Sequence, residues 1–171
     1  MKIKNNKYNL KELEYIFAQD FNTPLSYILA ESYFQLSEYN KSTKVCEIAL
    51  KHNKHNIMIQ YVLAKLYLLN DNYLNAEKLL KNVIDNNISH FKALKLFINI
   101  KIFLNSNLHT YKKYIQRAYK INPSNSKIKN LYNTLNLKKH TTTQSLIIKK
   151  RDNKIQVNEK LATKTMYSVF V

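Results

Sequence analysis

The sequence predicts an all-α fold in which pairs of helices stack on one another, and three observations carry this prediction. The chain repeats itself with a period of 34 residues, because the stretch LAESYF at 29–34 recurs as LAKLYL at 63–68. Apolar residues within each period recur every three or four positions, which is the spacing of one helix face. The 171 residues contain no glycine, and this disfavours β-hairpins that depend on Asn-Gly turns.

Each period is predicted to hold two helices separated by a short break. No pair can bury its apolar face alone, so the core must form between stacked pairs, and the helices at both ends must screen it. We expect an opening helix at 10–19, pairs at 25–36 and 40–52, 57–69 and 73–85, and 90–104 and 108–121, and a further helix capped by Ser124 or Asn125 that ends near Leu135.

The third pair is out of step with the first two. Ala118 follows Ala49 by 69 residues, one more than two periods of 34. We expect the added residue between Ser89 and Phe91, which places Asn99 at the position of Ala30 and Ala64.

Asparagine is expected to form the turns, because it tolerates positive φ better than other residues when glycine is absent. Asparagines stand at each predicted break, namely Asn40, Asn53, Asn70, Asn86, Asn105 and Asn122.

The repeated residues resemble the tetratricopeptide repeat (TPR) family over about 23–136. Ala30 and Ala64 stand at the family's small position, where its two helices approach closely, and Tyr33 and Tyr67 match its packing aromatic. Pro123 matches the proline that ends a unit. Ala76 matches the small residue early in the second helix, and Ala49 and Ala118 match the later alanine. The sequence departs from the family pattern in three ways: it has no glycine, Ser42 and Tyr111 replace the early alanine, and Asn99 stands at the small position of the third pair. The Thr-Pro-Leu-His signature of ankyrin repeats is absent.

The resemblance implies a right-handed α-α superhelix of about three helix pairs with flanking helices, whose first helices line a concave groove that binds a protein or peptide partner. The family's lysine and asparagine clamp for a peptide carboxyl terminus is not matched, since Tyr27 and Glu31 occupy its first two positions. The alternative for each groove residue is a purely structural place in the core. The expected groove residues are Tyr27, Glu31 and Phe34, then Tyr61, Lys65 and Leu68, then Leu96, Ile100 and Phe103.

The formal net charge of +17 raises the alternative of a basic protein that binds RNA or an anionic membrane surface. Nearly all of the excess is lysine, with arginine only at Arg117 and Arg151. Lysine lacks the planar fork with which arginine reads phosphates and bases, and abundant Lys, Asn, Ile and Tyr are typical of AT-rich codons. A nucleic-acid partner is therefore disfavoured, and a protein partner is preferred.

No set of residues predicts catalysis, a cofactor or a metal. The absence of glycine removes the phosphate-binding glycine loops. Cys46, the single cysteine, is expected to be an inert core thiol, and His52 and His55 lack a third ligand nearby. The sequence thus favours a non-enzymatic scaffold. No signal peptide or membrane-spanning stretch is evident, so the expected location is the cytoplasm.

The chain is expected to have four parts. A helical segment at 1–22 precedes the repeats at 23–137, which divide into 23–56, 57–91, 92–125 and a capping helix at 125–136. A linker follows at 138–157, with a short hairpin as the alternative. The tail at 158–171 is predicted to be an apolar helix that docks into its own groove or that of another copy; a frayed end and a fragment of a longer repeat protein are the alternatives.

Overall fold

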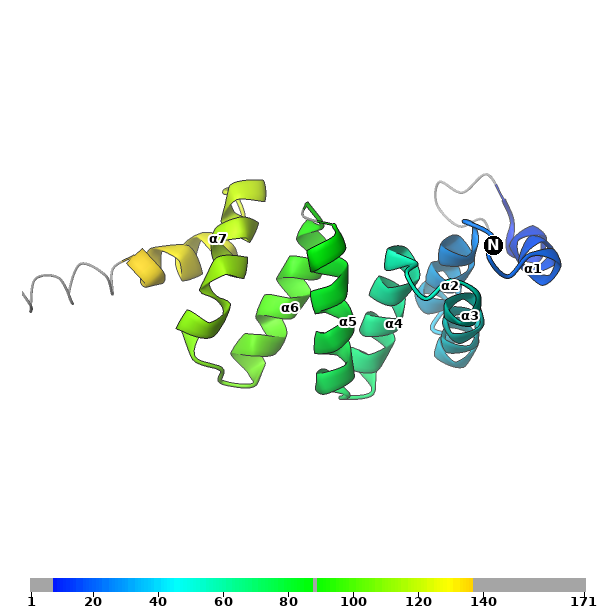
Figure 1. Ribbon diagram of the computed structural model, residues 1–171, viewed down its shortest axis with the longest axis horizontal. Helices are drawn as coiled ribbons and strands as arrows, with labels where there is room; N and C mark the ends of the chain where they lie inside the picture. Colours follow the sequence, from blue (N-terminus) through cyan, green and yellow to red (C-terminus); the bar gives the residue numbers. More distant parts are fainter. Residues whose placement is uncertain (1–7, 88, 137–171) are drawn as a thin grey trace, which may run out of the picture. The chain divides into compact units, whose positions relative to one another are not determined.

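The computed structural model describes residues 8–87 and 89–136, and its contacts divide the chain into two units, 1–122 and 123–171. The expected linker at 138–157, the tail at 158–171 and its self-association lie outside the described residues. Within the first unit the helices follow one another in the order α1 Leu10–Gln19, α2 Ser26–Gln35, α3 Tyr39–His52, α4 Ile57–Leu69, α5 Tyr73–Asn86, α6 Phe91–Phe103, the 3-10 helix η1 Leu108–Tyr111 and α7 Lys112–Ile121 (Figure 1).

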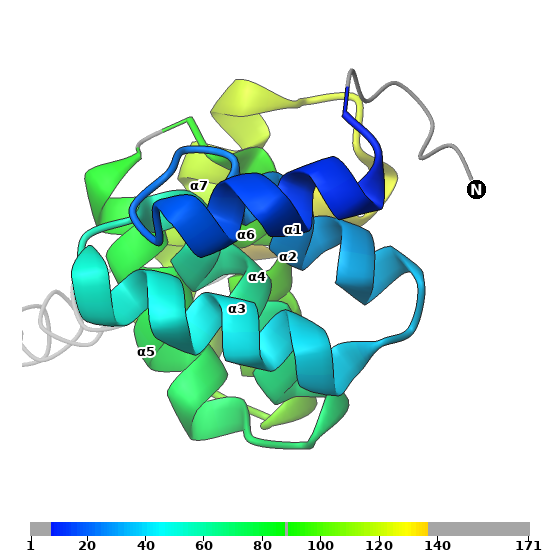
Figure 2. The same ribbon diagram turned by 90° about the vertical axis from the view of Figure 1, so that its right-hand side faces the viewer.

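The described residues form helices and turns without any strand, which confirms the predicted all-α fold. Each helix of the first unit packs against the next one in the chain, and α2 also contacts α4. Figure 2 looks along this stack from its α1 end, with α1, α2 and α3 in front of the later helices. In the second unit a helix at 126–136 begins after Asn125, whose side chain accepts from the backbone N–H of Ile128 at 3.2 Å.

Small residues allow the two helices of a pair to approach closely, as expected. Ala30 and Ala64 are fully buried, and Ala49 is 2% exposed. Ser42 takes the place of an alanine without leaving an unsatisfied hydroxyl in the core, because its Oγ donates to the carbonyl of Ala30 at 2.8 Å. Buried side chains from Leu13 of α1 to Leu66 of α4 form one continuous core cluster, which therefore extends both within and between the helix pairs.

The helices α2, α4 and α6 end in the same turn, a Schellman motif. Ser37, Asp71 and Asn105 follow these helices at positive φ of 61°, 54° and 49°, and they are spaced by 34 residues. In each turn the next backbone N–H donates to a carbonyl five residues earlier, which satisfies an otherwise unpaired helix end. These bonds join Glu38 to Tyr33, Asn72 to Tyr67 and Ser106 to Lys101, each at 2.9 Å.

These turns correct the expected place of the added residue. The spacing of 34 persists through Asn105, so nothing has been inserted between Ser89 and Phe91. The buried positions of α7 are instead 35 residues after those of α5, as with Leu80 and Ile115. The added residue lies between Asn105 and η1, where a 3-10 turn absorbs it. Fully buried Ile98, and not Asn99, is thus the counterpart of Ala64.

The expected role of the asparagines is also corrected. Among the six asparagines at predicted breaks, only Asn105 has positive φ. Asparagines at other positions act as N-caps, since the short side chain reaches the free N–H groups of the first helical turn. The caps are Asn9 before α1, Asn56 before α4, Asn72 before α5 and Asn107 before η1.

Replacing Ser37 with glycine should stabilise the protein. A residue with a Cβ atom at positive φ is strained by about 1–2 kcal/mol, and glycine avoids this strain while losing more entropy on folding. We expect a net gain of about 0.5–1 kcal/mol in the free energy of unfolding, measured by urea denaturation. Ser37→Ala is the control, because it keeps the Cβ atom; an equal gain in both variants would contradict the argument.

Candidate functional site

The neighbouring first helices α2 and α4 bring two of the three predicted groups of groove residues together. Tyr27, Glu31 and Phe34 project from α2, and their counterparts one period later are Tyr61, Lys65 and Leu68 on α4. Five of these six side chains are partly exposed, and Tyr61 is 9% exposed. We call these six residues the α2–α4 face.

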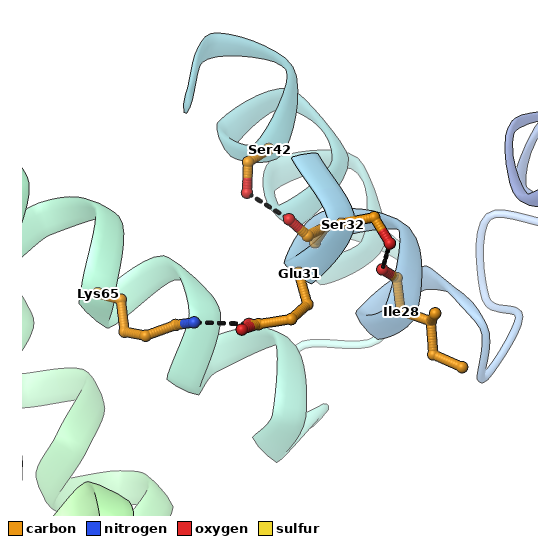
Figure 3. A network of polar contacts seen from close by, with 6 residues as sticks. Ile28, Glu31, Ser32, Ser42 and Lys65 are labelled. Atoms are coloured by element: carbon orange, nitrogen blue, oxygen red, sulfur yellow. Dashed lines mark hydrogen bonds and ion pairs between the residues drawn. The ribbon is translucent and has the colours of Figure 1, made fainter. Parts of the chain in front are cut away.

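An ion pair between the two helices lies at the centre of the α2–α4 face. The Nζ atom of Lys65 lies 2.5 Å from Oε2 of Glu31, and the two residues are one period of 34 apart in the sequence. The Lys65 and Glu31 side chains are only 15% and 24% exposed. Figure 3 shows Glu31 reaching from α2 to Lys65 of α4. The backbone of α2 also accepts hydrogen bonds from the hydroxyl groups of Ser32 and Ser42. The pair therefore joins successive repeats at a site with little water.

Aromatic rings surround the ammonium group of Lys65. Its Nζ atom lies 3.9 Å from the centre of the Phe34 ring and 5.5 Å from that of Tyr61, which are favourable cation–π distances. Burial, and then the negative charge of Glu31, raise the pKa of Tyr27 and raise that of Tyr61 to about 12. Both tyrosines are therefore uncharged at neutral pH. The α2–α4 face offers ring surface and hydroxyl groups around an internally neutralised pair of charges.

The third predicted group does not continue this face. Ile100 is 3% exposed and lies in the core, Leu96 is partly buried, and the 63% exposed Phe103 packs against Tyr73 of α5 at 4.8 Å between ring centres. The reason is that the sequence predicts the added residue before α6, whereas it lies after α6. The third group is therefore assigned one residue too late in the chain. The residues one period after Tyr61, Lys65 and Leu68 are Lys95, Asn99 and Ile102, none of them buried.

The sequence alone did not identify Lys95, Asn99 and Ile102 as the counterparts of the α4 groove residues. The signal that identifies it is the 34-residue spacing of the three turn residues Ser37, Asp71 and Asn105. Three different amino acids hold these positions, so the recurrence is recognisable only from their backbone conformation.

Solved TPR structures are similar to this chain. YrrB, described as a TPR protein with an unusual peptide-binding site, aligns with a TM-score of 0.65 and 11% identity over 72% of this chain and 64% of YrrB. The described helices have the tetratricopeptide-repeat fold. MamA aligns with a TM-score of 0.62 and 12% identity over 77% of each chain. The second TPR domain of human RPAP3, in complex with an HSP70 peptide, aligns with a TM-score of 0.53 and 18% identity over 65% of this chain and 92% of that domain.

Comparison of the sequence with family models and with curated proteins finds no match. The likeness to solved TPR structures therefore rests on the backbone, since the identities are only 11–18%. The chain spans less than two thirds of the YrrB length. None of the described helices is long and apolar enough to cross a membrane.

Cys46, His52 and His55 are residue types that can serve as a nucleophile or as metal ligands, and the sequence disfavours both roles for them. Cys46 is fully buried, and burial raises the pKa of its thiol to about 12, so the reactive thiolate is suppressed. His52 and His55 are exposed, and His52 packs on Phe21 with 5.2 Å between ring centres. Within the described part of the chain, no three His, Cys, Asp or Glu residues come together as a metal site.

His90 has a structural role at the start of α6, beside the α2–α4 face. Its Nδ1 atom accepts from the backbone N–H of Ala93 at 3.1 Å, as an N-cap. Its ring lies 4.7 Å from that of Tyr61. Burial lowers the pKa of His90, and nearby Lys92 lowers it further. The neutral ring that can accept this hydrogen bond is therefore the favoured form.

Proposed function

We propose that this chain is a non-catalytic scaffold that binds a segment of a protein partner on the α2–α4 face. The observation that carries the proposal is the partly exposed cluster of Tyr27, Phe34 and Leu68 around the Glu31–Lys65 pair. Apolar side chains of a partner would pack on the rings and on Leu68, as in other helical grooves. YrrB and the RPAP3 domain, which share the fold, are described with a peptide-binding site and a bound peptide.

The electrostatics of the face support a peptide over a highly charged ligand. Because Glu31 and Lys65 neutralise each other, a partner need not supply a charge at the centre. Lys92 and Lys95 of α6 are exposed and would speed association with a partner that has acidic flanks. The location we propose is the cytoplasm, in keeping with a single buried cysteine.

Selection of random peptides displayed on phage, with the purified chain as bait, tests the proposal. Enriched peptides are synthesised, and their Kd is measured by fluorescence anisotropy with the wild type and the double variant Phe34→Ala, Leu68→Ala. We expect Kd to rise roughly tenfold or more, since two central apolar contacts are lost. Tyr15→Ala, Leu74→Ala is the matched control, because both residues are well exposed elsewhere, at 68% and 79%.

The proposal fails if no peptide is enriched, or if the control weakens binding as much as the face variant does. Circular dichroism of both variants verifies that helical content is retained. Repeating the titration at rising salt separates the peptide mode from phosphate binding, because only the latter loses affinity steeply.

A further inference from the structure

A row of lysines crosses the second helices of the repeats, on the side away from their buried residues. Lys44 on α3, Lys78 on α5 and Lys113 on α7 hold the same place in each pair, since their spacings of 34 and 35 residues follow the register of the structure. All three side chains are exposed. We call the exposed sides of α3, α5 and α7 the outer face.

The outer face has a large excess of positive charge. Its further exposed lysines are Lys41, Lys51, Lys81 and Lys120, and its exposed acids are Glu47 and Asp85. Lys41 pairs with Glu38, and Glu77 is engaged by Lys101 of α6. The face is thus complementary in charge to an anionic partner.

Exposed apolar side chains gather at one edge of this face. Leu74, 79% exposed, shares one side of α5 with Lys78 and Lys81, at spacings of four and three residues. Phe103 is 63% exposed and packs on Tyr73, which precedes Leu74. Leu69 and Leu104, at 50% and 42% exposure, end α4 and cap α6 at the same edge. Figure 1 shows the α4–α5 and α6–α7 turns on that edge together.

The turns at the other end of the helices, which lead into the first helix of each following pair, expose less apolar surface. Their exposed apolar residues, Phe21, Met58 and Ile121, are 37–38% exposed. Apart from Tyr15 of α1, which is 68% exposed, the most exposed large apolar groups therefore lie beside the outer face, at the end where α4 turns into α5. Such a group costs solvation energy unless a partner covers it.

The combination of lysines and protruding apolar groups distinguishes between partners. A second copy of the chain is disfavoured, because both copies are strongly positive at +17. A nucleic-acid backbone would engage the lysines but would leave Leu74 and Phe103 in water. An anionic bilayer engages both, since lysines attract its headgroups and leucine and phenylalanine enter its interface.

We propose that the outer face of α3, α5 and α7, with Leu69, Leu74, Phe103 and Leu104 at its edge, docks on an anionic lipid bilayer. The docking is peripheral, with lysines over the headgroups and the apolar edge inserted at the interface. It goes beyond the peptide scaffold, because the α2–α4 face belongs to the first helices. A partner bound there would be held at a membrane surface.

Vesicle sedimentation with the full chain tests the charge component. Wild type should pellet with phosphatidylcholine vesicles that contain about 30% phosphatidylserine, and far less with phosphatidylcholine alone. The triple variant Lys44→Glu, Lys78→Glu, Lys113→Glu should lose at least about tenfold in partition coefficient. The control Lys54→Glu, Lys92→Glu, Lys95→Glu makes the same change in net charge at exposed lysines away from this face, and it should lose less than about half of that factor on the same principle.

Fluorescence tests the apolar component. The variant Leu74→Cys is labelled with an environment-sensitive dye such as NBD, and the buried Cys46 leaves the new thiol as the reactive one. Emission should rise and shift to the blue on phosphatidylserine vesicles. The same dye at Asn22→Cys, an exposed position in the turn between α1 and α2 at the opposite end of the helices, should respond less.

Three results would overturn the proposal. They are no binding to anionic vesicles, an equal loss in the two triple variants, and an unchanged dye spectrum at position 74 on bound vesicles. If an oligo-uridine of about 20 nucleotides binds and only the outer-face variant loses it, while vesicles do not compete, the face belongs to RNA instead.

Discussion

Replacing Leu80 with alanine is expected to lower the free energy of unfolding by about 3 kcal/mol, within the range for buried leucines. Leu80 is fully buried in α5, and this helix packs against both α4 and α6. The lost isopropyl group leaves a cavity that the surrounding helices fill only in part. A loss of this size is a large fraction of the stability of a small domain.

The position of Leu80 within the stack adds a second expected effect. Repeat proteins fold through interfaces between neighbours, and a cavity in α5 weakens the interface between the second and third pairs. Urea unfolding followed by circular dichroism should therefore show both a lower midpoint and a broader transition than for the wild type.

Leu74→Ala is the matched control for Leu80→Ala. Leu74 lies in the same helix and undergoes the same chemical change, but it is 79% exposed. We expect its stability to change by less than about 0.5 kcal/mol, as for most surface sites. Similar losses in the two variants would show that burial in α5 is not what stabilises this part of the fold.

The second large effect concerns the Glu31–Lys65 pair, which should stabilise the protein much more than a surface ion pair does. Both side chains are mostly buried, and the ring of Phe34 also faces Lys65. Removing one partner leaves a charge in a site with little water. In a double-mutant cycle of Glu31→Gln and Lys65→Met, we expect a coupling energy of about 1–2 kcal/mol, between the values for exposed and fully buried pairs.

The chain contains a control pair of the same length. Lys41 and Glu38 are also 2.5 Å apart, but their side chains are 60% and 39% exposed. The same cycle with Lys41→Met and Glu38→Gln should give a much smaller coupling, which salt should weaken further. Equal couplings for the two pairs would contradict the role assigned to burial.

The positions of the helices could be predicted from the sequence because they depend on local properties. Apolar spacing and capping residues act within one or two turns, so α1 at Leu10–Gln19 and α4 at Ile57–Leu69 lie where they are expected. The same holds for the period of 34 between the first two pairs, which the recurring residues at 29–34 and 63–68 reveal directly.

The register of α6 could not be predicted in this way. Polar, turn-forming residues occur both before α6, around Ser89, and after it, at 105–107, so either segment was a reasonable place for an added residue. Only the backbone of Ser37, Asp71 and Asn105 distinguishes them. Because of this one-residue error, Ile100 was expected in the groove, whereas it lies in the core and is 3% exposed.

The sequence by itself determined that this protein is a stack of helix pairs, because a helix and its ends are specified by neighbours in the chain. The tertiary structure decided which side chains meet between repeats. Glu31 and Lys65 are 34 residues apart, and whether they pair depends on how α2 packs against α4. Likewise, the alignment of Lys44, Lys78 and Lys113 depends on the register of three helices. Packing between distant segments is a property of the whole chain, so no local pattern could reveal either arrangement.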